Sequence, residues 1–142
     1  MISNTEHVGF QEEKDLLLKD LSARLPYDVK CRYVEGYGIV TQISKYGVLT
    51  IRSQDGFCDR KIESVNPYLF PLSSMTEEQR TELCLLHNSI GIYEDNEIVV
   101  YYARTEFTHL QVVFDWLNSH HFDFRGLIDR KLAIDATGLN IY

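Results

Sequence analysis

Three successive stretches in the first half of the chain decide the fold: Asp28-Val-Lys-Cys-Arg-Tyr-Val34, Tyr37-Gly-Ile-Val-Thr-Gln-Ile43 and Val48-Leu-Thr-Ile-Arg52. The first alternates polar and apolar residues, a period of two that is typical of a strand with one buried face. A fourth strand is expected at 57–62. The stretches are separated by glycine-containing breaks, which predict tight turns. These breaks are Glu35-Gly36, Lys45-Tyr-Gly47 and Gln54-Asp-Gly56. The spacing predicts an antiparallel meander, either a small, strongly bent sheet or an SH3-like barrel.

A helix is predicted before this meander, over residues 10–25. Leu17, Leu21 and Leu25 recur at helical spacing and predict a buried stripe. Charged residues between the leucines are expected to form the solvent-facing side, and Pro26 ends the helix. These charged residues are Glu12, Glu13, Lys14, Asp15, Lys19 and Asp20.

The second half of the chain is expected to be richer in helix. Residues 66–75 form an extended connector held to the core, because two prolines keep it from coiling. Thr76-Glu-Glu-Gln79 matches a capping box that starts a helix to about residue 87. The remaining expected elements are a hairpin (90–93 and 98–103 around the loop 94–97), a helix at 106–119 capped by Thr105, a short helix near 125–131, and an extended tail at 132–135.

These elements predict one α+β domain over residues 1–142. A subdivision would separate a helix and small barrel at 1–65 from a helical and hairpin unit at 66–142. No signal peptide or membrane-spanning run is visible, and the three cysteines lack the spacing of a disulfide framework or a zinc site. These features predict a cytoplasmic protein that makes no membrane contact.

Charge is distributed unevenly along the chain. The formal net charge is −7, with −2 in residues 1–26, +1 in residues 27–65 and −6 in residues 66–142. An acidic chain repels phosphate backbones at long range, so nonspecific nucleic-acid binding is disfavoured everywhere except in the middle third.

Catalytic motifs are not found. The sequence has no P-loop, dinucleotide fingerprint, GxSxG or HExxH pattern, and no cofactor or metal is expected. His120 and His121 with His109 lack the spacing of a zinc site. His120 and His121 are expected instead to cap the end of a helix, where an imidazolium suits the helix dipole. A small hydrolase-like site around His121 and Asp123 is the third functional alternative. Cys58 and Cys84 match no thiol-enzyme signature and are interpreted as small core residues.

Trp116-Leu-Asn-Ser-His-His-Phe-Asp-Phe-Arg-Gly-Leu-Ile-Asp129 is the segment with the most distinctive side chains, including the only tryptophan. Arg125 is expected to pair with an acidic residue and hold the turn before Gly126. Without a catalytic constellation, protein binding is the leading hypothesis for a small aromatic-rich domain. The candidate binding residues are Trp116, His120, His121, Phe122, Phe124 and Arg125.

The alternative hypothesis is nucleic-acid binding by the 27–65 strand region. Aromatic side chains that stack on bases are interspersed there with cations that contact phosphates. The cations singled out are Lys30, Arg32 and Lys61. The others in the region are Lys45, Arg52 and Arg60, among the aromatic residues Tyr27, Tyr33, Tyr37, Tyr46 and Phe57.

Three blocks of the sequence carry a family resemblance. They are Leu16-Leu-Leu-Lys-Asp-Leu-Ser-Ala-Arg-Leu-Pro-Tyr-Asp-Val-Lys30, Asn66-Pro-Tyr-Leu-Phe-Pro-Leu-Ser-Ser-Met-Thr-Glu-Glu78, and the Trp116–Asp129 segment with Leu132-Ala-Ile-Asp135. Together they resemble a family of small uncharacterised proteins of gut-dwelling bacteria, their prophages and mobile elements. The resemblance implies a cytoplasmic accessory protein of phage or mobile-element type, and it carries over no catalytic or binding residue. The leading expectation is therefore a non-enzymatic module that binds a protein partner.

Overall fold

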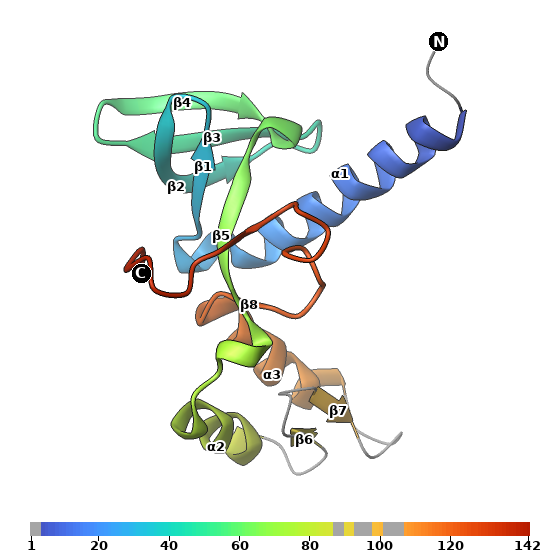
Figure 1. The fold of residues 1–142 in the computed structure, drawn as a ribbon, viewed down its shortest axis with the longest axis vertical. Coiled ribbons are helices and arrows are strands. Elements are labelled where there is room, and N and C mark those ends of the chain that lie inside the picture. The colour runs from blue at the N-terminus through green and yellow to red at the C-terminus, as the bar shows by residue number, and fades with distance from the viewer. Residues whose placement is uncertain (1–3, 87–89, 93–97, 101–106) are drawn as a thin grey trace.

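The computed structural model describes residues 4–86, 90–92, 98–100 and 107–142, and Figure 1 draws their ribbon. The chain begins with α1 (Asn4–Arg24), which continues into a 3-10 turn at Leu25–Tyr27. A meander of four strands follows, and β5 (Asn66–Pro71) then leads to a second group of elements at the other end of the molecule. The last stretch of chain returns alongside β5, so the two ends of the molecule are joined by more than one segment.

The predicted meander is confirmed. Its strands are β1 (Lys30–Tyr33), β2 (Gly36–Ile43), β3 (Val48–Ser53) and β4 (Gly56–Lys61), each antiparallel to the next. They belong to a mixed sheet of seven strands in the order β4-β3-β2-β1-β5-β8, with β9 also paired to β5. The α+β class is therefore confirmed.

The expectation of an SH3-like barrel is wrong, because the sheet is open. Closing a barrel requires the outer strands to pair with each other. β5 makes only two residue pairs with β1 and then continues beyond the meander, where it pairs in parallel with β9 (Ile134–Asp135) and β8 (Phe122–Asp123). The connector predicted at 66–75 is thus extended, as expected, but its first half is a central strand that leaves β4 as an edge.

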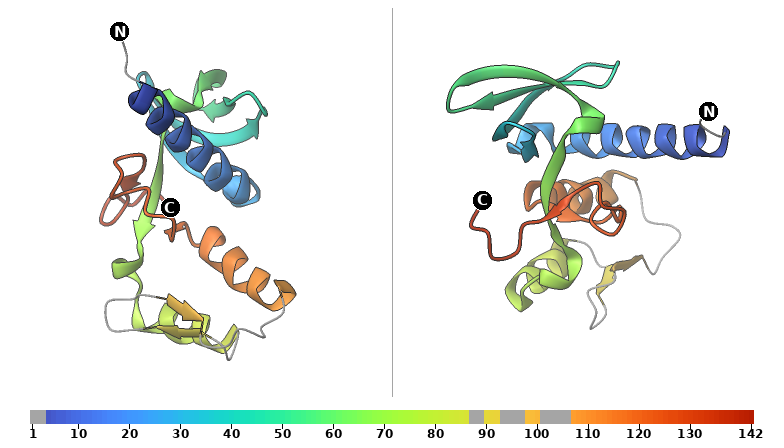
Figure 2. Two further views of the ribbon diagram at one scale, coloured as in Figure 1. Left: turned by 90° about the vertical axis from the view of Figure 1, so that its right-hand side faces the viewer. Right: turned by 45° about the horizontal axis from the view of Figure 1, so that its top comes forward.

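α1 covers one face of the meander, which we call the inner face (Figure 2). Alternate strand residues point toward the helix and join its leucines in a buried cluster. Its members include Leu17, Leu21, Cys31, Val40, Leu49 and Ile51, with Leu127 and Ala133 from the returning C-terminal stretch. The opposite face, which we call the outer face, has no helix over it in the described part of the chain.

Gly38 allows β2 and β3 to approach closely at the bend of the sheet. A Cβ atom built there would lie 2.4 Å from the carbonyl oxygen of Arg52 and 2.7 Å from Cγ2 of Ile51. The nearer atom belongs to the backbone, so relief of the clash would require the two strands to move apart.

We expect Gly38→Ala to lower the free energy of unfolding by about 1–3 kcal/mol, as overpacking of a well-packed interior does. Urea denaturation followed by circular dichroism measures this. Gly9→Ala is the matched control, because Gly9 lies in α1 with nothing within 4 Å of its Cβ position. Alanine there should stabilise the protein by up to about 1 kcal/mol through helix propensity. Equal effects at the two positions would contradict the close approach.

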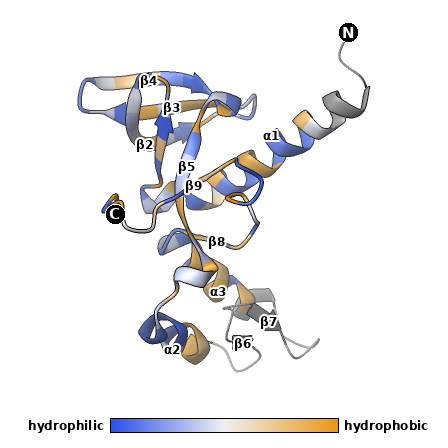
Figure 3. Cartoon of the chain, in the orientation of Figure 1, coloured by the Kyte–Doolittle hydropathy of each residue, from blue (hydrophilic) through white to orange (hydrophobic). Residues whose placement is uncertain are grey.

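The second group of elements contains α2 (Glu77–Leu86), the β6–β7 hairpin (Ile90–Ile92 and Ile98–Val100) and α3 (Phe107–Ser119). The predicted capping box is confirmed, since Gln79 N donates to Thr76 Oγ1 (3.1 Å) and Thr76 N donates to Gln79 Oε1 (2.9 Å). Figure 3 shows α3 as mainly hydrophobic, and α3 packs with α2 in a second buried cluster. That cluster includes Met75, Leu83, Val113, Trp116, Leu117 and Phe122. The predicted hairpin loop 94–97 and the Thr105 cap lie outside the described residues.

Two expectations for the C-terminal half are wrong. It is not helix-rich, because its two described α-helices alternate with five strands. The short helix near 125–131 is instead a series of turns, since Gly126 (φ 76°) and Lys131 (φ 62°) adopt left-handed backbone conformations that interrupt a helix. No helix in the described residues is long and apolar enough to span a membrane.

Candidate functional site

The Trp116–Asp129 segment forms an aromatic stack at the end of α3. The Trp116 ring stacks on His120 (4.1 Å between centroids) and lies nearly parallel to Phe122 (5.8 Å). Its Nε1 donates to Glu82 Oε1 of α2 at 3.0 Å. Trp116 and Phe122 are buried, so these contacts mainly join α3 to α2 and to β5.

A buried ion network joins the same segment to α1. The Asp20 carboxylate accepts from Arg24 Nε at 2.9 Å and from Arg125 Nη1 at 2.8 Å, and Arg24 Nη2 donates to the Phe122 carbonyl at 2.6 Å. Asp20 and Arg24 are fully buried. Both guanidinium groups also lie over the Phe124 ring, at 4.3 Å for Arg125 and 5.6 Å for Arg24.

This network tests two expectations. Arg125 does pair with an acidic residue, but its partner comes from a helix 105 positions earlier in the chain. The placement of Asp20 on the solvent-facing side of that helix is wrong. The returning C-terminal stretch covers this part of α1, which helical periodicity alone cannot reveal.

Asp123 holds the turn that follows it. One carboxylate oxygen accepts from the backbone N–H of Arg125 (3.3 Å) and Leu127 (3.0 Å), and the other accepts from Ile128 N (2.9 Å). No hydrogen bond joins Asp123 to His121, although both residues are described. The Asp123 carboxylate therefore accepts hydrogen bonds from the backbone and does not orient His121 as a general base.

The two histidines have different environments. His120 Nδ1 lies 2.9 Å from the Trp116 carbonyl in the last turn of α3, as expected for a capping histidine. His121 is buried beneath the Tyr142 ring (3.6 Å between centroids), and its backbone is left-handed (φ 62°). Burial, with the nearby positive charges of Arg24, His120 and Lys30, lowers the pKa of His121 to about 4. The expected imidazolium at position 121 is therefore wrong, because the ring stays neutral at pH 7.

This environment makes stability depend on pH. Between pH 6.5 and 4 the unfolded chain binds a proton at His121 that the folded chain does not, so acidification favours unfolding. We expect this group to remove up to about 3 kcal/mol of stability as the pH falls from 7 to 4.

Urea titrations at several pH values test that expectation. His121→Asn removes the titrating ring, and asparagine tolerates left-handed angles. Stability of this variant should fall less steeply with acid than that of the wild type. His120→Asn is the control and should change the slope much less than His121→Asn does. Identical slopes for the wild type and His121→Asn would contradict the buried neutral histidine.

The segment provides little catalytic geometry. A pocket of about 210 Å³ is lined by His120 and Phe122, with Phe70, Gln79 and Thr137 among its other walls.

Burial raises the pKa of the Cys31 thiol to about 12, and all three cysteines are free. The described residues contain no group of three or more His, Cys, Asp or Glu side chains placed to hold a metal ion.

The outer face of the meander carries the three cations singled out in the strand region, with Arg32 toward one end of the strands and Lys61 toward the other. Backbone pairing aligns Lys30 with Ile39, Ile39 with Arg52, and Arg52 with Phe57, so these four residues form one row across four strands. Paired residues in a sheet point to the same side. In the row on one side of these four residues, Arg32 pairs with Tyr37. In the next two rows on the other side, Thr50 pairs with Asp59 and then Val48 with Lys61.

Positive charge on these strands is largely unneutralised. Arg32, Arg52 and Lys61 are exposed and have no ion-pair partner among the described residues. The one carboxylate in these rows, Asp59, accepts a hydrogen bond from Thr50 Oγ1 at 2.8 Å. By contrast, Arg60 points away from this face and pairs with Glu35 at 3.1 Å.

Two aromatic rings lie among these cations. Tyr37 is 55% exposed and Phe57 is 71% exposed. Burying such rings is favourable, so large exposed aromatics indicate a surface that binds something. The outer face thus combines flat apolar rings with a local excess of positive charge, in a chain that is acidic overall.

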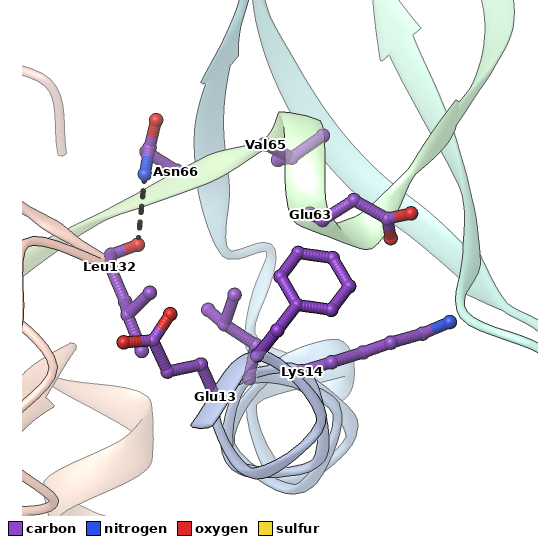
Figure 4. Close-up of a pocket in the computed structure, with 8 residues that line it drawn as sticks. Glu13, Lys14, Glu63, Val65, Asn66 and Leu132 are labelled. Atoms are coloured by element: carbon purple, nitrogen blue, oxygen red, sulfur yellow. Dashed lines mark hydrogen bonds between the residues drawn. The ribbon is translucent and has the colours of Figure 1, made fainter. Parts of the chain in front are cut away.

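A depression of about 290 Å³ opens on this face. It is lined by Lys30, Tyr37, Gly38, Ile39, Arg52, Ser53 and Gln54. A smaller pocket of about 60 Å³ lies between α1 and β5, where Asn66 Nδ2 donates to the Leu132 carbonyl at 3.1 Å (Figure 4). Only the first approaches the roughly 300–1,000 Å³ of small-molecule sites.

Residues at the end of the sequence position Lys30. Its Nζ donates to the Ile141 carbonyl at 2.5 Å and lies 5.5 Å from the Tyr142 ring centre. The Tyr142 hydroxyl accepts from Lys30 N and donates to the Tyr68 carbonyl, both at 2.8 Å, so it bridges β1 and β5. Tyr142 is 41% exposed as a residue, but desolvation of this hydroxyl between the strands raises its pKa above the usual value, so it is protonated and can donate at pH 7.

Sequence reasoning noted the cations and aromatics of the strand region but did not identify Arg52, Tyr37 and Phe57 as one surface with Lys30. The signal was present, because Lys30 and Arg32 are two positions apart, as are Asp59 and Lys61, and such residues share a face. The roles of Asp20, Arg24 and Tyr142 had no local signal. No protein-family model, curated protein or solved structure matches the chain.

Proposed function

We propose that this protein is a non-enzymatic binding module whose ligand is single-stranded nucleic acid, bound on the outer face of β1–β4. The observation that carries the proposal is the row of Lys30, Ile39, Arg52 and Phe57 across four strands, flanked by Tyr37 and Arg32. Proteins that bind single strands combine cations that follow the phosphates with aromatic rings on which bases stack.

Overall charge does not oppose this proposal as strongly as the net value of −7 suggests. Screening limits the reach of exposed charges to about 8 Å at physiological salt, so a ligand at the surface responds mainly to the nearest groups. The charged groups that the strands present on this face are four cations and one carboxylate, namely Lys30, Arg32, Arg52, Lys61 and Asp59.

Single strands fit this surface better than a duplex does. Exposed rings on a sheet can stack only on bases that are not already stacked and paired. The resemblance to small proteins of prophages and mobile elements also suits an accessory factor that accompanies exposed nucleic acid.

The leading hypothesis from the sequence, a protein partner bound by the Trp116–Arg125 segment, has less support. Most of that segment's side chains are buried in contacts within the chain, which leaves few of them to meet a partner. It remains the alternative proposal, and it predicts binding that does not depend on the outer face.

Fluorescence anisotropy with labelled 12-nucleotide strands of DNA and RNA, and with the corresponding duplex, tests the proposal. Replacing both Tyr37 and Phe57 by alanine should weaken single-strand binding by at least about 30-fold, because each stacked base contributes roughly 1–3 kcal/mol and two rings are lost. Tyr46→Ala is the matched control, since Tyr46 is 75% exposed but lies in the β2–β3 turn. Absence of single-strand binding at low salt, or equal losses in the control, would exclude this face as the site.

A further inference from the structure

We infer that the depression between Lys30, Tyr37 and Arg52 is a site for one nucleotide, with its phosphate between the two cations and its base against the Tyr37 ring. This inference rests on the proposed function. It locates one defined binding position within the charged outer face. The volume of about 290 Å³ is near the lower limit of small-ligand sites.

Phosphate contact is provided by two cations that face the same depression. Lys30 and Arg52 both pair with Ile39, from opposite sides, so their backbones are two strands apart. A phosphate above Ile39 would lie between an ammonium and a guanidinium, whose planar fork can donate two hydrogen bonds to one phosphate.

Lys30 is held in place before any ligand arrives. One of its three ammonium hydrogens is directed to the Ile141 carbonyl, and its Nζ lies over the Tyr142 ring. The other two hydrogens remain for a phosphate. Immobilising a long side chain usually costs about 0.5–1.5 kcal/mol on binding, and here the fold has already met that cost.

Base contact is provided by one ring and one turn. Tyr37 forms a wall of the depression and is more than half exposed, so its face can accept a stacked base. Gln54 lies in the β3–β4 turn at the rim, and its amide can both donate to and accept from the edge of a base. The neighbouring Ser53 hydroxyl is already donated to the Gly56 carbonyl at 3.2 Å.

The test compares small probes that contain or lack the base. Backbone and glutamine side-chain amide signals of the full chain are followed by NMR during titration with adenosine, guanosine, cytidine and uridine monophosphates, ribose 5-phosphate and inorganic phosphate. We expect shifts at Tyr37, Ile39, Arg52 and Gln54, with at least one nucleotide binding about tenfold or more tightly than ribose 5-phosphate. Tyr37→Leu should remove that difference, whereas Tyr46→Leu should keep it.

The outcomes separate this inference from the function on which it rests. If nucleotides and ribose 5-phosphate bind equally, the depression is only an anion site and the inference is overturned. If 12-nucleotide strands bind but nucleotides leave the depression unshifted, the inference fails and the proposed function stands. If neither binds, both fail.

Discussion

Asp20→Ala is expected to lower the free energy of unfolding by about 3–5 kcal/mol, the usual cost of removing one partner from a buried ion pair. The carboxylate is fully buried and is bound by both Arg24 and Arg125. Its removal leaves the Arg24 guanidinium buried with only the Phe122 carbonyl as a described hydrogen-bond acceptor. Chemical denaturation at pH 7 measures the loss.

Asp15→Ala is a matched control on the same helix. Asp15 is exposed and accepts a surface hydrogen bond from Gln11 at 2.9 Å, also between residues four positions apart. Its replacement should change stability by no more than about 0.5 kcal/mol. Asp20→Leu combined with Arg24→Met should be less destabilising than Asp20→Ala alone, because the unpaired charge is then removed as well. If the double variant lost as much stability as the sum of the losses in Asp20→Leu and Arg24→Met, the buried-charge explanation would be contradicted.

Replacing Arg32, Arg52 and Lys61 together by alanine is expected to remove most single-strand binding at 50 mM salt. For single strands the logarithm of affinity falls with the logarithm of salt concentration with a slope of about −0.7 per phosphate contacted. Three phosphate contacts, one of them shared by Lys30 and Arg52, predict a slope of about −2 for the wild type, and the triple variant, which keeps Lys30, should have a slope of about −0.7. Anisotropy titrations from 20 to 200 mM salt measure both values.

A second triple variant separates local charge from overall charge. Lys19, Lys45 and Arg130 are exposed cations on α1, the β2–β3 turn and the C-terminal turns. Their replacement by alanine changes the net charge by the same amount, but it should leave the slope at the wild-type value. Equal losses in the two triple variants would show that binding depends only on net charge, and the outer face would then have no special role.

The meander was predictable because its determinants are local. Alternating residues in Asp28–Val34 and glycine-containing turns fix strands, and the Thr76–Gln79 capping box fixes a helix start within four residues. The open sheet was not predictable in this way. Whether β5 closes a barrel or continues past it depends on its pairing with Phe122 and Ile134, which are more than 50 positions later in the chain.

The candidate sites show the same distinction. The period of two along each strand places the cations and rings on one face, and only the correct register between strands is then needed to align them. Asp20 has the local appearance of a solvent-exposed charge, and only contact with Arg125 shows it to be buried. His121 likewise resembles a helix cap until Tyr142 covers it.

The bridge made by Tyr142 has a consequence for the order of folding. Lys30 N and the Tyr68 carbonyl are joined through a hydroxyl that lies 112 positions after Lys30. During synthesis the meander can form early from contacts between neighbouring strands, because local contacts assemble quickly. The strands β1 and β5 can pair directly, but the Tyr142 bridge between them can form only after residue 142 has left the ribosome. The nucleotide site that we infer, in which residues 141 and 142 position Lys30, would therefore be completed after the meander, and a nascent chain would display the outer face before that site has formed.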